Sequence, residues 1–256
     1  SSPTLHMKTS PFYQGPVWIV DDDGSSSGEG SPDEPAQYIR DMIEAAADGD
    51  TILVMPGTYT GSRNRNLDFQ YNNDINSNGV KNLVLKSAYG PDTTIIDLDG
   101  NDFIDIINGE NNSRIEGLTI SNSNTGAVYV WNLGNGASSI EIDNCIFLNN
   151  SNGSFSPGGA IDLNSNSNNP IIVTNTIFQG NYAGDRGGAV NINSDGCEAY
   201  FGNCIFYNNS CGDNGGAINQ DSNTNLVIVN SLFIDNYSTN WGVGGINSYA
   251  GMYGGN

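Results

Sequence analysis

The chain has 256 residues and a formal net charge of −20, from 28 Asp and Glu against 8 Lys and Arg. So large a negative charge repels nucleic acid and anionic lipid, and the single histidine, His6, nearly excludes chemistry built on histidine. No run approaches the roughly 18 apolar residues that a membrane-spanning helix needs. We therefore expect no nucleic-acid partner and no insertion into a membrane.

The first elements along the chain are a polar tail, residues 1–16, and a helix, residues 33–49. Hydrophobic residues make up 37% of the chain, enough for a buried core, and we expect residues 17–256 to form one domain around it. The helical segment has acidic residues near its start and stops at Gly49. Its apolar face consists of Ile39, Met42, Ile43 and Ala46.

Residues 50–130 contain short segments in which apolar and polar residues alternate. Alternation over about five residues, with β-branched enrichment and Gly, Asn or Ser at the boundaries, is typical of β-strands. Because these segments are irregularly spaced, we expect three irregular coils of strand here. They comprise residues 50–60, 80–88 with 93–98, and 112–122 with 125–130.

Residues 131–256 contain an internal repeat. The pattern N-x-[IL]-F-x-x-N occurs four times, and its phenylalanines, Phe147, Phe178, Phe206 and Phe233, are 31, 28 and 27 residues apart. A Gly-Gly pair follows each phenylalanine, and strand-like runs lie between the motifs. Four copies of two motifs in the same order indicate a repeat architecture.

Short strands without helices fit a coil in which each strand pairs with its equivalent in the next coil, about 4.8 Å away. The expected fold class is therefore all-β, a right-handed parallel β-helix (solenoid) of about seven coils. The helix at residues 33–49 would be its N-terminal α-helical cap, since solenoids need a cap to shield their terminal strands.

Asparagine is unusually frequent, with 39 residues. Asn tolerates the left-handed backbone conformation of tight corners, and its amide can donate to and accept from an identical residue one coil away. The repeat predicts two such structural ladders and an internal column of stacked phenylalanines. The first ladder is Asn144, Asn175, Asn203 and Asn230, and the second is Asn150, Asn181, Asn209 and Asn236.

Two family resemblances rest on these motifs. The segments VWIVDDDGSSSGEG, AQYIRDMIEAAADGD and LVLKSAYGPDTTIIDLDG resemble the N-terminal portion of secreted bacterial right-handed β-helix proteins of the pectate-lyase-like superfamily. The F-x-x-N motifs followed by GGAI, GGAV or GGIN resemble the repeats of polymorphic outer membrane proteins, which are surface-exposed adhesins. These resemblances imply the β-helix fold and an extracellular or bacterial cell-surface location. Neither fixes the function, because the same fold carries lyases, hydrolases, esterases and adhesins.

The cationic residues bear on whether the chain is a polysaccharide lyase. A lyase of this fold needs a Lys or Arg base, usually with Ca²⁺ or another cation beside the sugar carboxylate. Residues 115–256 contain one cationic side chain, Arg186, so that half cannot form a basic groove. The candidate bases in the earlier coils, for which a solvated surface role is the alternative, are Arg63, Arg65, Lys81, Lys86 and Arg114.

Glycoside hydrolysis instead needs clustered acidic residues that act as acid and base. Asp162, Asp195, Asp221 and Asp235 recur near turns, but they form no tight pair accompanied by a histidine. From the sequence we therefore assign no catalytic residue.

One acidic run is suited to calcium. Asp97, Asp99 and Asn101 alternate around a glycine, with Asp105 beyond them, which lets a loop present oxygen ligands to a hard cation. An ordinary acidic turn between strands is the alternative. Calcium is the one cofactor that the sequence suggests.

The four cysteines have no metal-binding spacing. Cys145 and Cys204 occupy the same position two coils apart, a separation of about 9.6 Å that is beyond disulfide reach. A bridge from Cys197 or Cys204 to Cys211 is easier, and an exported protein would permit it.

Exposed aromatic side chains could stack on sugars or contact a partner protein. The candidates are Trp131, Tyr182, Tyr207, Tyr237 and Trp241. We expect a non-enzymatic, adhesin-like or structural module that displays loops and aromatics to a glycan or a surface protein. The alternative is a Ca²⁺-assisted polysaccharide lyase or another carbohydrate-active enzyme with its groove on the earlier coils.

The last repeat is followed by no recognisable cap, so we also expect either further coils or end-to-end stacking of copies into a fibre.

Overall fold

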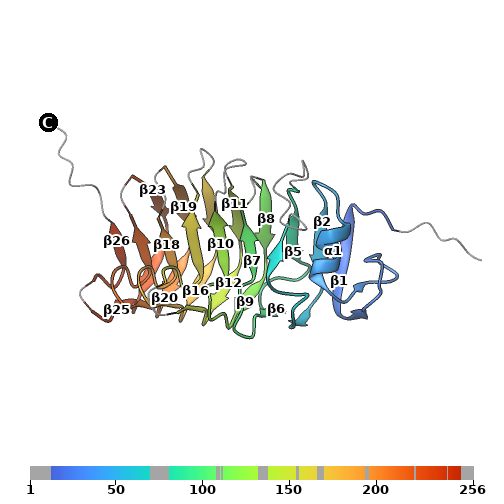
Figure 1. Cartoon of the computed structure of the whole chain (residues 1–256), viewed down its shortest axis with the longest axis horizontal. Coiled ribbons are helices and arrows are strands. Elements are labelled where there is room, and N and C mark those ends of the chain that lie inside the picture. Colours follow the sequence, from blue (N-terminus) through green and yellow to red (C-terminus); the bar gives the residue numbers. More distant parts are fainter. Residues whose placement is uncertain are drawn as a thin grey trace, which may run out of the picture.

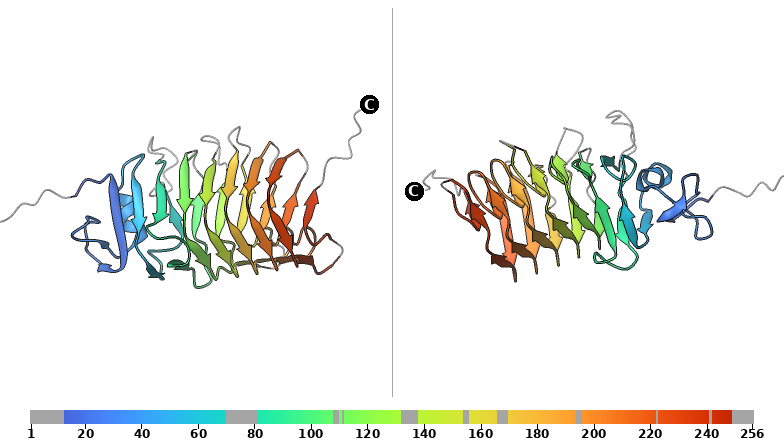
Figure 2. Two further views of the ribbon diagram at one scale, coloured as in Figure 1. Left: turned by 180° about the vertical axis from the view of Figure 1, so that it is seen from behind. Right: turned by 90° about the horizontal axis from the view of Figure 1, so that it is seen from below.

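The strands of the protein stack along one axis. The structure, a computed structural model, describes residues 13–248 except for 70–80, 108, 109, 111, 132–137, 154, 155, 166–169, 194, 195, 222 and 241. Figure 1 shows the strands side by side along the long axis of the molecule, in sequence order from the blue to the red end. Figure 2 shows the same stack from behind and from below.

The strands form four sheets, which we call sheets A to D. Sheet A contains β1 (Val17–Ser25), β2 (Thr51–Val54), β5 (Val84–Ser87), β8 (Ser113–Glu116), β11 (Ile140–Asp143), β15 (Ile171–Thr174), β19 (Glu198–Gly202) and β23 (Asn225–Val229). Sheet B contains β3 (Gly57–Tyr59), β6 (Thr94–Asp97), β9 (Thr119–Ser121), β12 (Ile146–Leu148), β16 (Ile177–Gln179), β20 (Ile205–Tyr207) and β24 (Leu232–Ile234). Sheet C contains β4 (Leu67–Asp68), β7 (Ile104–Ile106), β10 (Val128–Trp131), β14 (Ile161–Asn164), β18 (Val190–Ile192), β22 (Ile218–Gln220) and β26 (Ile246–Ser248). Sheet D contains β13 (Ser151–Asn152), β17 (Tyr182–Ala183), β21 (Ser210–Cys211) and β25 (Tyr237–Ser238).

One coil of the regular half contributes one strand to each sheet, in the order A, B, D and C. Equivalent strands of neighbouring coils pair in parallel, for example β8 with β11 and β18 with β22. The predicted fold class, an all-β parallel β-helix with a single helix among the described residues, is confirmed. The described strands number eight in sheet A, seven in sheets B and C and four in sheet D, so the coil count differs from face to face.

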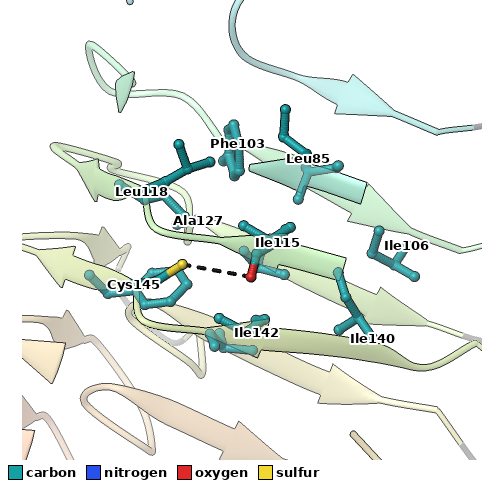
Figure 3. Packing of buried hydrophobic residues seen from close by; sticks show 14 of the residues in the cluster. Leu85, Phe103, Ile106, Ile115, Leu118, Ala127, Ile140, Ile142 and Cys145 are labelled. Carbon is teal, nitrogen blue, oxygen red and sulfur yellow. Dashed lines mark hydrogen bonds between the residues drawn. The ribbon is translucent and has the colours of Figure 1, made fainter. Parts of the chain in front are cut away.

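Alternate residues of each strand fill the interior of the coils. Within β11, Ile140 and Ile142 are buried, whereas Glu141 faces outward. Figure 3 shows such residues from successive coils packed against one another, with the thiol of Cys145 donating to the carbonyl oxygen of Ile115 at 3.8 Å. This arrangement follows from the alternation in the sequence, because successive side chains of a strand point to opposite faces.

The cysteines belong to this core. All four are free and buried, so the bridge from Cys197 or Cys204 to Cys211 that the sequence allows is not formed. Burial raises the pKa of the Cys145 thiol to about 12, and those of Cys197 and Cys204 to about 11. The thiols therefore stay protonated and pack as small apolar groups.

The repeat phenylalanines form the single internal column that the sequence predicts. Phe147, Phe178, Phe206 and Phe233 pair in register on sheet B. Successive rings are parallel within 5°, with centroids 4.7 to 5.1 Å apart. This separation suits offset stacking, and it confirms that one copy of the motif is one turn of the solenoid.

The second asparagine column is a buried hydrogen-bonded ladder. Oδ1 of Asn181 accepts from the backbone N–H (3.0 Å) and the side-chain amide (3.2 Å) of Asn150, while Nδ2 of Asn181 donates to the carbonyl oxygen of Phe147 (3.0 Å). The amide-to-amide contacts recur from Asn181 to Asn209 and from Asn209 to Asn236. Each amide satisfies backbone groups that the corner between sheets B and D buries.

The first asparagine column lies at the exposed corner between sheets A and B. Asn144, Asn175, Asn203 and Asn230 have φ between 49° and 55°, the left-handed region that Asn tolerates. Among the described residues, one amide-to-amide contact links this column, from Asn203 to Asn175 (3.3 Å), while Asn175 donates to Asp143 (2.7 Å). Backbone conformation, rather than a continuous amide ladder, therefore accounts for these four asparagines.

The helix α1 spans Ile39–Ala45 and lies at the N-terminal end of the stack, as Figure 1 shows. Three residues of the predicted face, Ile39, Met42 and Ile43, are buried in the helix, and Ala46 is buried just beyond it. No described helix is both long enough and apolar enough to cross a membrane.

The helix is shorter than the predicted segment, residues 33–49, because the chain before it pairs with β1. The N–H of Ser25 donates to the carbonyl oxygen of Pro35 (3.1 Å), and Ala36 forms a parallel bridge with Val20. These contacts hold residues 35 and 36 extended, so the helix begins only after them.

The last coil leaves large apolar side chains exposed. The exposed fractions of Leu232, Tyr237 and Val243 are 56%, 50% and 53%. In the preceding coil, Ile205, which is the register partner of Leu232, is only partly exposed because strands flank it on both sides. End-to-end stacking of copies stays a prediction.

Candidate functional site

A pocket of about 510 Å³ lies on the outer face of sheet C, over β7 and β10. Figure 1 places these two strands next to each other in the middle of the stack. Asp105 is flanked in β7 by the buried Ile104 and Ile106, so its side chain faces outward, and it pairs in register with Tyr129 of β10. The pocket is lined by Asp102, Asp105, Ile107, Tyr129 and Trp131.

The two carboxyl groups of the pocket differ in environment. Burial, together with the nearby negative charge of Asp102, raises the pKa of Asp105 to about 6. The side-chain amide of Asn66, turned so that its nitrogen faces Asp102, donates to Oδ1 of that carboxylate (2.8 Å). The pocket thus contains two carboxyl groups, and the pKa of one of them, Asp105, is raised toward neutral.

The aromatic walls of the pocket meet nearly at a right angle. The rings of Tyr129 and Trp131 have centroids 6.4 Å apart and an interplanar angle of 73°. The Tyr129 hydroxyl accepts a hydrogen bond from Nδ2 of Asn152 (3.3 Å), and burial, reinforced by Asp162, raises the pKa of Tyr129 to about 12. Tyr129 is therefore neutral at physiological pH, and 40% of the surface of Trp131 is exposed.

A polar column continues from the pocket along sheet C. Tyr129 pairs in register with Asp162, which begins a run of amides that the sequence did not lead us to expect. Asn191 donates to Asp162 (2.8 Å), Asn219 to Asn191 (2.9 Å) and Asn247 to Asn219 (2.8 Å). Burial raises the pKa of Asp162 to about 6, even though the hydrogen bond from Asn191 opposes the shift.

We expect Asp162→Asn to stabilise the protein at about pH 7.5 by about 2 kcal/mol. The pKa of Asp162 in the folded protein, about 6, lies above its ordinary value of 3.8. The stability that this raised pKa contributes is therefore fully present below about pH 4 and is lost as pH rises through about 6. Asn carries no charge and can still accept from Asn191. Urea unfolding of both proteins at about pH 4 and about pH 7.5 measures the difference, and a variant less stable than wild type at the higher pH would contradict the prediction.

No cationic side chain among the described residues lines the pocket. Arg63 pairs with Asp41 beside a separate cavity, and Arg65 donates to the carbonyl oxygen of Leu98 (2.6 Å) and to Asp99 (3.2 Å). The other described cations also lie away from the pocket. Arg40 and Lys81 donate to backbone carbonyls, and Lys86 and Arg114 lie on sheet A. Arg186 faces Asp185, Asp213 and Asp221.

The structure does not bring the four predicted calcium ligands together. Oδ1 of Asp97 accepts from Asn122 (3.1 Å), and Asp99 forms its ion pair with Arg65. Asn101 closes the turn through its amide, whereas Asp105 lies in the sheet C pocket. No group of three or more His, Cys, Asp or Glu side chains that could hold a metal occurs in the described part of the chain.

The predicted aromatic residues lie on different faces. Trp131 lines the sheet C pocket, Tyr207 faces outward from sheet B, and Tyr182 and Tyr237 lie on sheet D. Trp241 lies outside the described residues. Only Trp131 therefore joins the candidate site, and the other described aromatics do not gather around it.

Sequence reasoning missed Asp102, Ile107 and Tyr129 as members of one site. The signal was present in two strands, IDI at 104–106 and VYV at 128–130, where a polar residue stands between buried aliphatic neighbours. Such a residue must face outward, but the sequence did not show that Asp105 and Tyr129 are register partners.

No protein-family model matches the sequence, and no curated protein matches it. Among solved structures, rhamnogalacturonan lyase is similar, with 14% identity, a TM-score of 0.50 and coverage of 91% of this chain and 62% of that one. Pectate lyase Pel9A has 14% identity, a TM-score of 0.44 and coverage of 87% and 68%. The chain thus spans less than two thirds of the length of the rhamnogalacturonan lyase. The protein has a parallel β-helix fold, which it shares with the rhamnogalacturonan lyase.

Proposed function

We propose that the protein is a carbohydrate-active enzyme that binds a polysaccharide in the sheet C pocket and cleaves it by proton transfer through Asp105. The observation that carries this proposal is the presence of two carboxyl groups, Asp102 and Asp105, in one pocket with Tyr129 and Trp131. Aromatic rings provide apolar faces for sugar rings, and paired carboxyl groups of unequal acidity serve glycosidic bond cleavage. The fold shared with a rhamnogalacturonan lyase supports carbohydrate as the ligand class.

The pocket favours hydrolysis over elimination. Elimination at a uronic acid needs positive charge beside the sugar carboxylate, and no described cation lines the pocket. In hydrolysis, Asp105 would give its proton to the leaving glycosidic oxygen as the bond between that oxygen and the anomeric carbon breaks. Asp102 would take a proton from the attacking water, whose oxygen bonds to the anomeric carbon. Proton exchange with solvent then restores both groups.

A polymeric substrate also indicates where the protein acts. A polysaccharide supplied from outside is too large to cross a cell membrane unaided, so an enzyme that cleaves such a polymer acts outside the cell. We accordingly propose that the protein works in the extracellular medium or at a bacterial cell surface.

The proposal is tested by assaying depolymerisation of polygalacturonate, rhamnogalacturonan, xylan and chitosan. New reducing ends formed without unsaturated ends report hydrolysis, whereas elimination gives a reducing end and an unsaturated end together. Parallel reactions with a chelator test the calcium expected at the Asp97 to Asn101 turn. We expect new reducing ends from at least one polymer, and we expect Asp105→Asn to lower the rate about a hundredfold.

The matched control is Asp235→Asn, which changes the net charge equally at an exposed turn of the last coil. It should leave the rate unchanged. Full activity of Asp105→Asn, or no cleavage of any polymer by the wild type, would refute the proposal. Unsaturated ends that disappear with chelator would instead establish a calcium-dependent lyase.

A further inference from the structure

The walls of the sheet C pocket are suited to a positive ligand. The rings of Tyr129 and Trp131, inclined at 73° to each other, both line the pocket, and a cation near the face of such a ring is attracted by the ring quadrupole. Asp102 and Asp105 add two carboxyl groups to the same cavity. An ammonium group is attracted both by the faces of aromatic rings and by carboxylates.

Among the residues that the structure describes, no cationic side chain lines the pocket to balance its charge. The Asn66 amide that faces Asp102 is neutral, and the cation closest in sequence to that amide, Arg65, is held by Asp99 and a backbone carbonyl. Burial and, to a lesser extent, the negative charge of Asp102 raise the pKa of Asp105 to about 6. A bound ammonium group would supply the missing positive charge.

The same surroundings disfavour a uronic acid polymer. A sugar carboxylate in the pocket would meet Asp102 and Asp105 with no described Lys or Arg to neutralise it. The net charge of −20 adds a long-range repulsion of polyanions as they approach.

We propose that the polysaccharide bound in the sheet C pocket is an amino-sugar polymer whose free amine, as ammonium, lies between Asp102 and the rings of Tyr129 and Trp131. This inference rests on the proposed function and adds to it the chemical class of the substrate. Asp105 keeps its role as the acid and Asp102 its role as the base, and the Asp102 carboxylate in addition selects the amine.

Calorimetric titration with three matched oligosaccharides tests the inference at about pH 6, where amines of sugars are largely protonated. The probes are hexamers of glucosamine, of N-acetylglucosamine and of galacturonic acid. We expect the glucosamine hexamer to bind about tenfold more tightly than its acetylated counterpart, because acetylation removes the charge, and we expect no binding of the galacturonate hexamer. Added salt should weaken the glucosamine interaction most.

Two variants locate the amine. Asp102→Asn should reduce the preference for glucosamine over N-acetylglucosamine to about onefold to twofold, while Asp235→Asn, with the same change in net charge, should keep it. Should Asp102→Asn fail to fold, Trp131→Leu serves instead, because the exposed ring can be removed without opening the core. It should lower the preference as well.

The outcomes separate this inference from the proposed function. Equal or tighter binding of the acetylated or galacturonate hexamer, while Asp105→Asn still abolishes cleavage, would overturn the amino-sugar inference and leave the enzyme proposal standing. An unchanged preference in both Asp102→Asn and Trp131→Leu would also overturn it. If no hexamer binds and no polymer is cleaved, both proposals fail.

Discussion

Replacing Asn181 by Ala is expected to lower the free energy of unfolding by about 4 kcal/mol. The substitution removes the acceptor of the buried Asn150 N–H and the donor to the Phe147 carbonyl oxygen, and both groups lie inside the corner between sheets B and D. A buried polar group left without a partner costs about 1–3 kcal/mol, and the substitution also breaks the amide contacts to Asn150 and Asn209, which together account for the loss. Urea unfolding followed by circular dichroism measures it.

Asn175→Gly is the matched control. Asn175 belongs to the same coil and to the other asparagine column, but its side chain is exposed. Its φ of 52° suits glycine, so the variant should stay within about 0.5 kcal/mol of wild type. Equal losses at the two positions would show that the buried ladder has no special part in stability.

The buried ladder also reaches the coil that carries the candidate site. Oδ1 of Asn150 accepts from the backbone N–H of Ser123 (3.1 Å), and Nδ2 of Asn150 donates to the carbonyl oxygen of Ile120 (2.9 Å). Both residues precede β10, the strand with Tyr129 and Trp131. The regular half of the solenoid therefore provides a rigid support against which this coil is fixed.

The fold was predictable because the repeat encodes it at several independent levels. The phenylalanine spacing gives the coil length, the asparagines mark corners that require left-handed φ or buried amides, and the alternation gives the inward face. Stacked phenylalanines and parallel pairing in register both follow from these signals. The helix was predicted less well. Residues 35 and 36, at the start of the predicted segment, pair with β1, and no local sequence pattern indicates this pairing.

The site was less predictable because it lies on the irregular coils. Asp105 and Tyr129 are register partners although only 24 residues separate them, fewer than the 27 to 31 between the repeat phenylalanines. Without a repeat to set the register, the sequence could not place Asp105 beside Tyr129, and Asp105 was assigned instead to a calcium loop with Asp97 and Asp99. Trp131 was selected correctly as an exposed aromatic, but its partners in the pocket come from strands whose pairing only the structure gives.

Replacing Gly188 by Ala is expected to lower the free energy of unfolding by about 4 kcal/mol, as much as Asn181→Ala. A Cβ atom on Gly188 would lie 2.1 Å from the carbonyl oxygen of Gly216 and 2.4 Å from that of Ser210. Both are backbone atoms of the next coil, so no side-chain rotation can relieve the overlap. The coils would have to move apart, which breaks contacts such as the hydrogen bond from the Gly188 N–H to the carbonyl oxygen of Gly215 (3.0 Å).

Gly245→Ala provides the comparison, since Gly245 is in register with Ala189 and Ala217 of the preceding coils, and no described atom lies within 4 Å of the position its Cβ would take. We expect this variant to stay within about 0.5 kcal/mol of wild type in urea unfolding. If Gly188→Ala does not fold under conditions in which Gly245→Ala folds, that result also supports the expected loss of stability. A Gly188→Ala protein with the wild-type unfolding midpoint would contradict the prediction. It would mean that neighbouring coils do not approach each other closely at the Gly-Gly pairs.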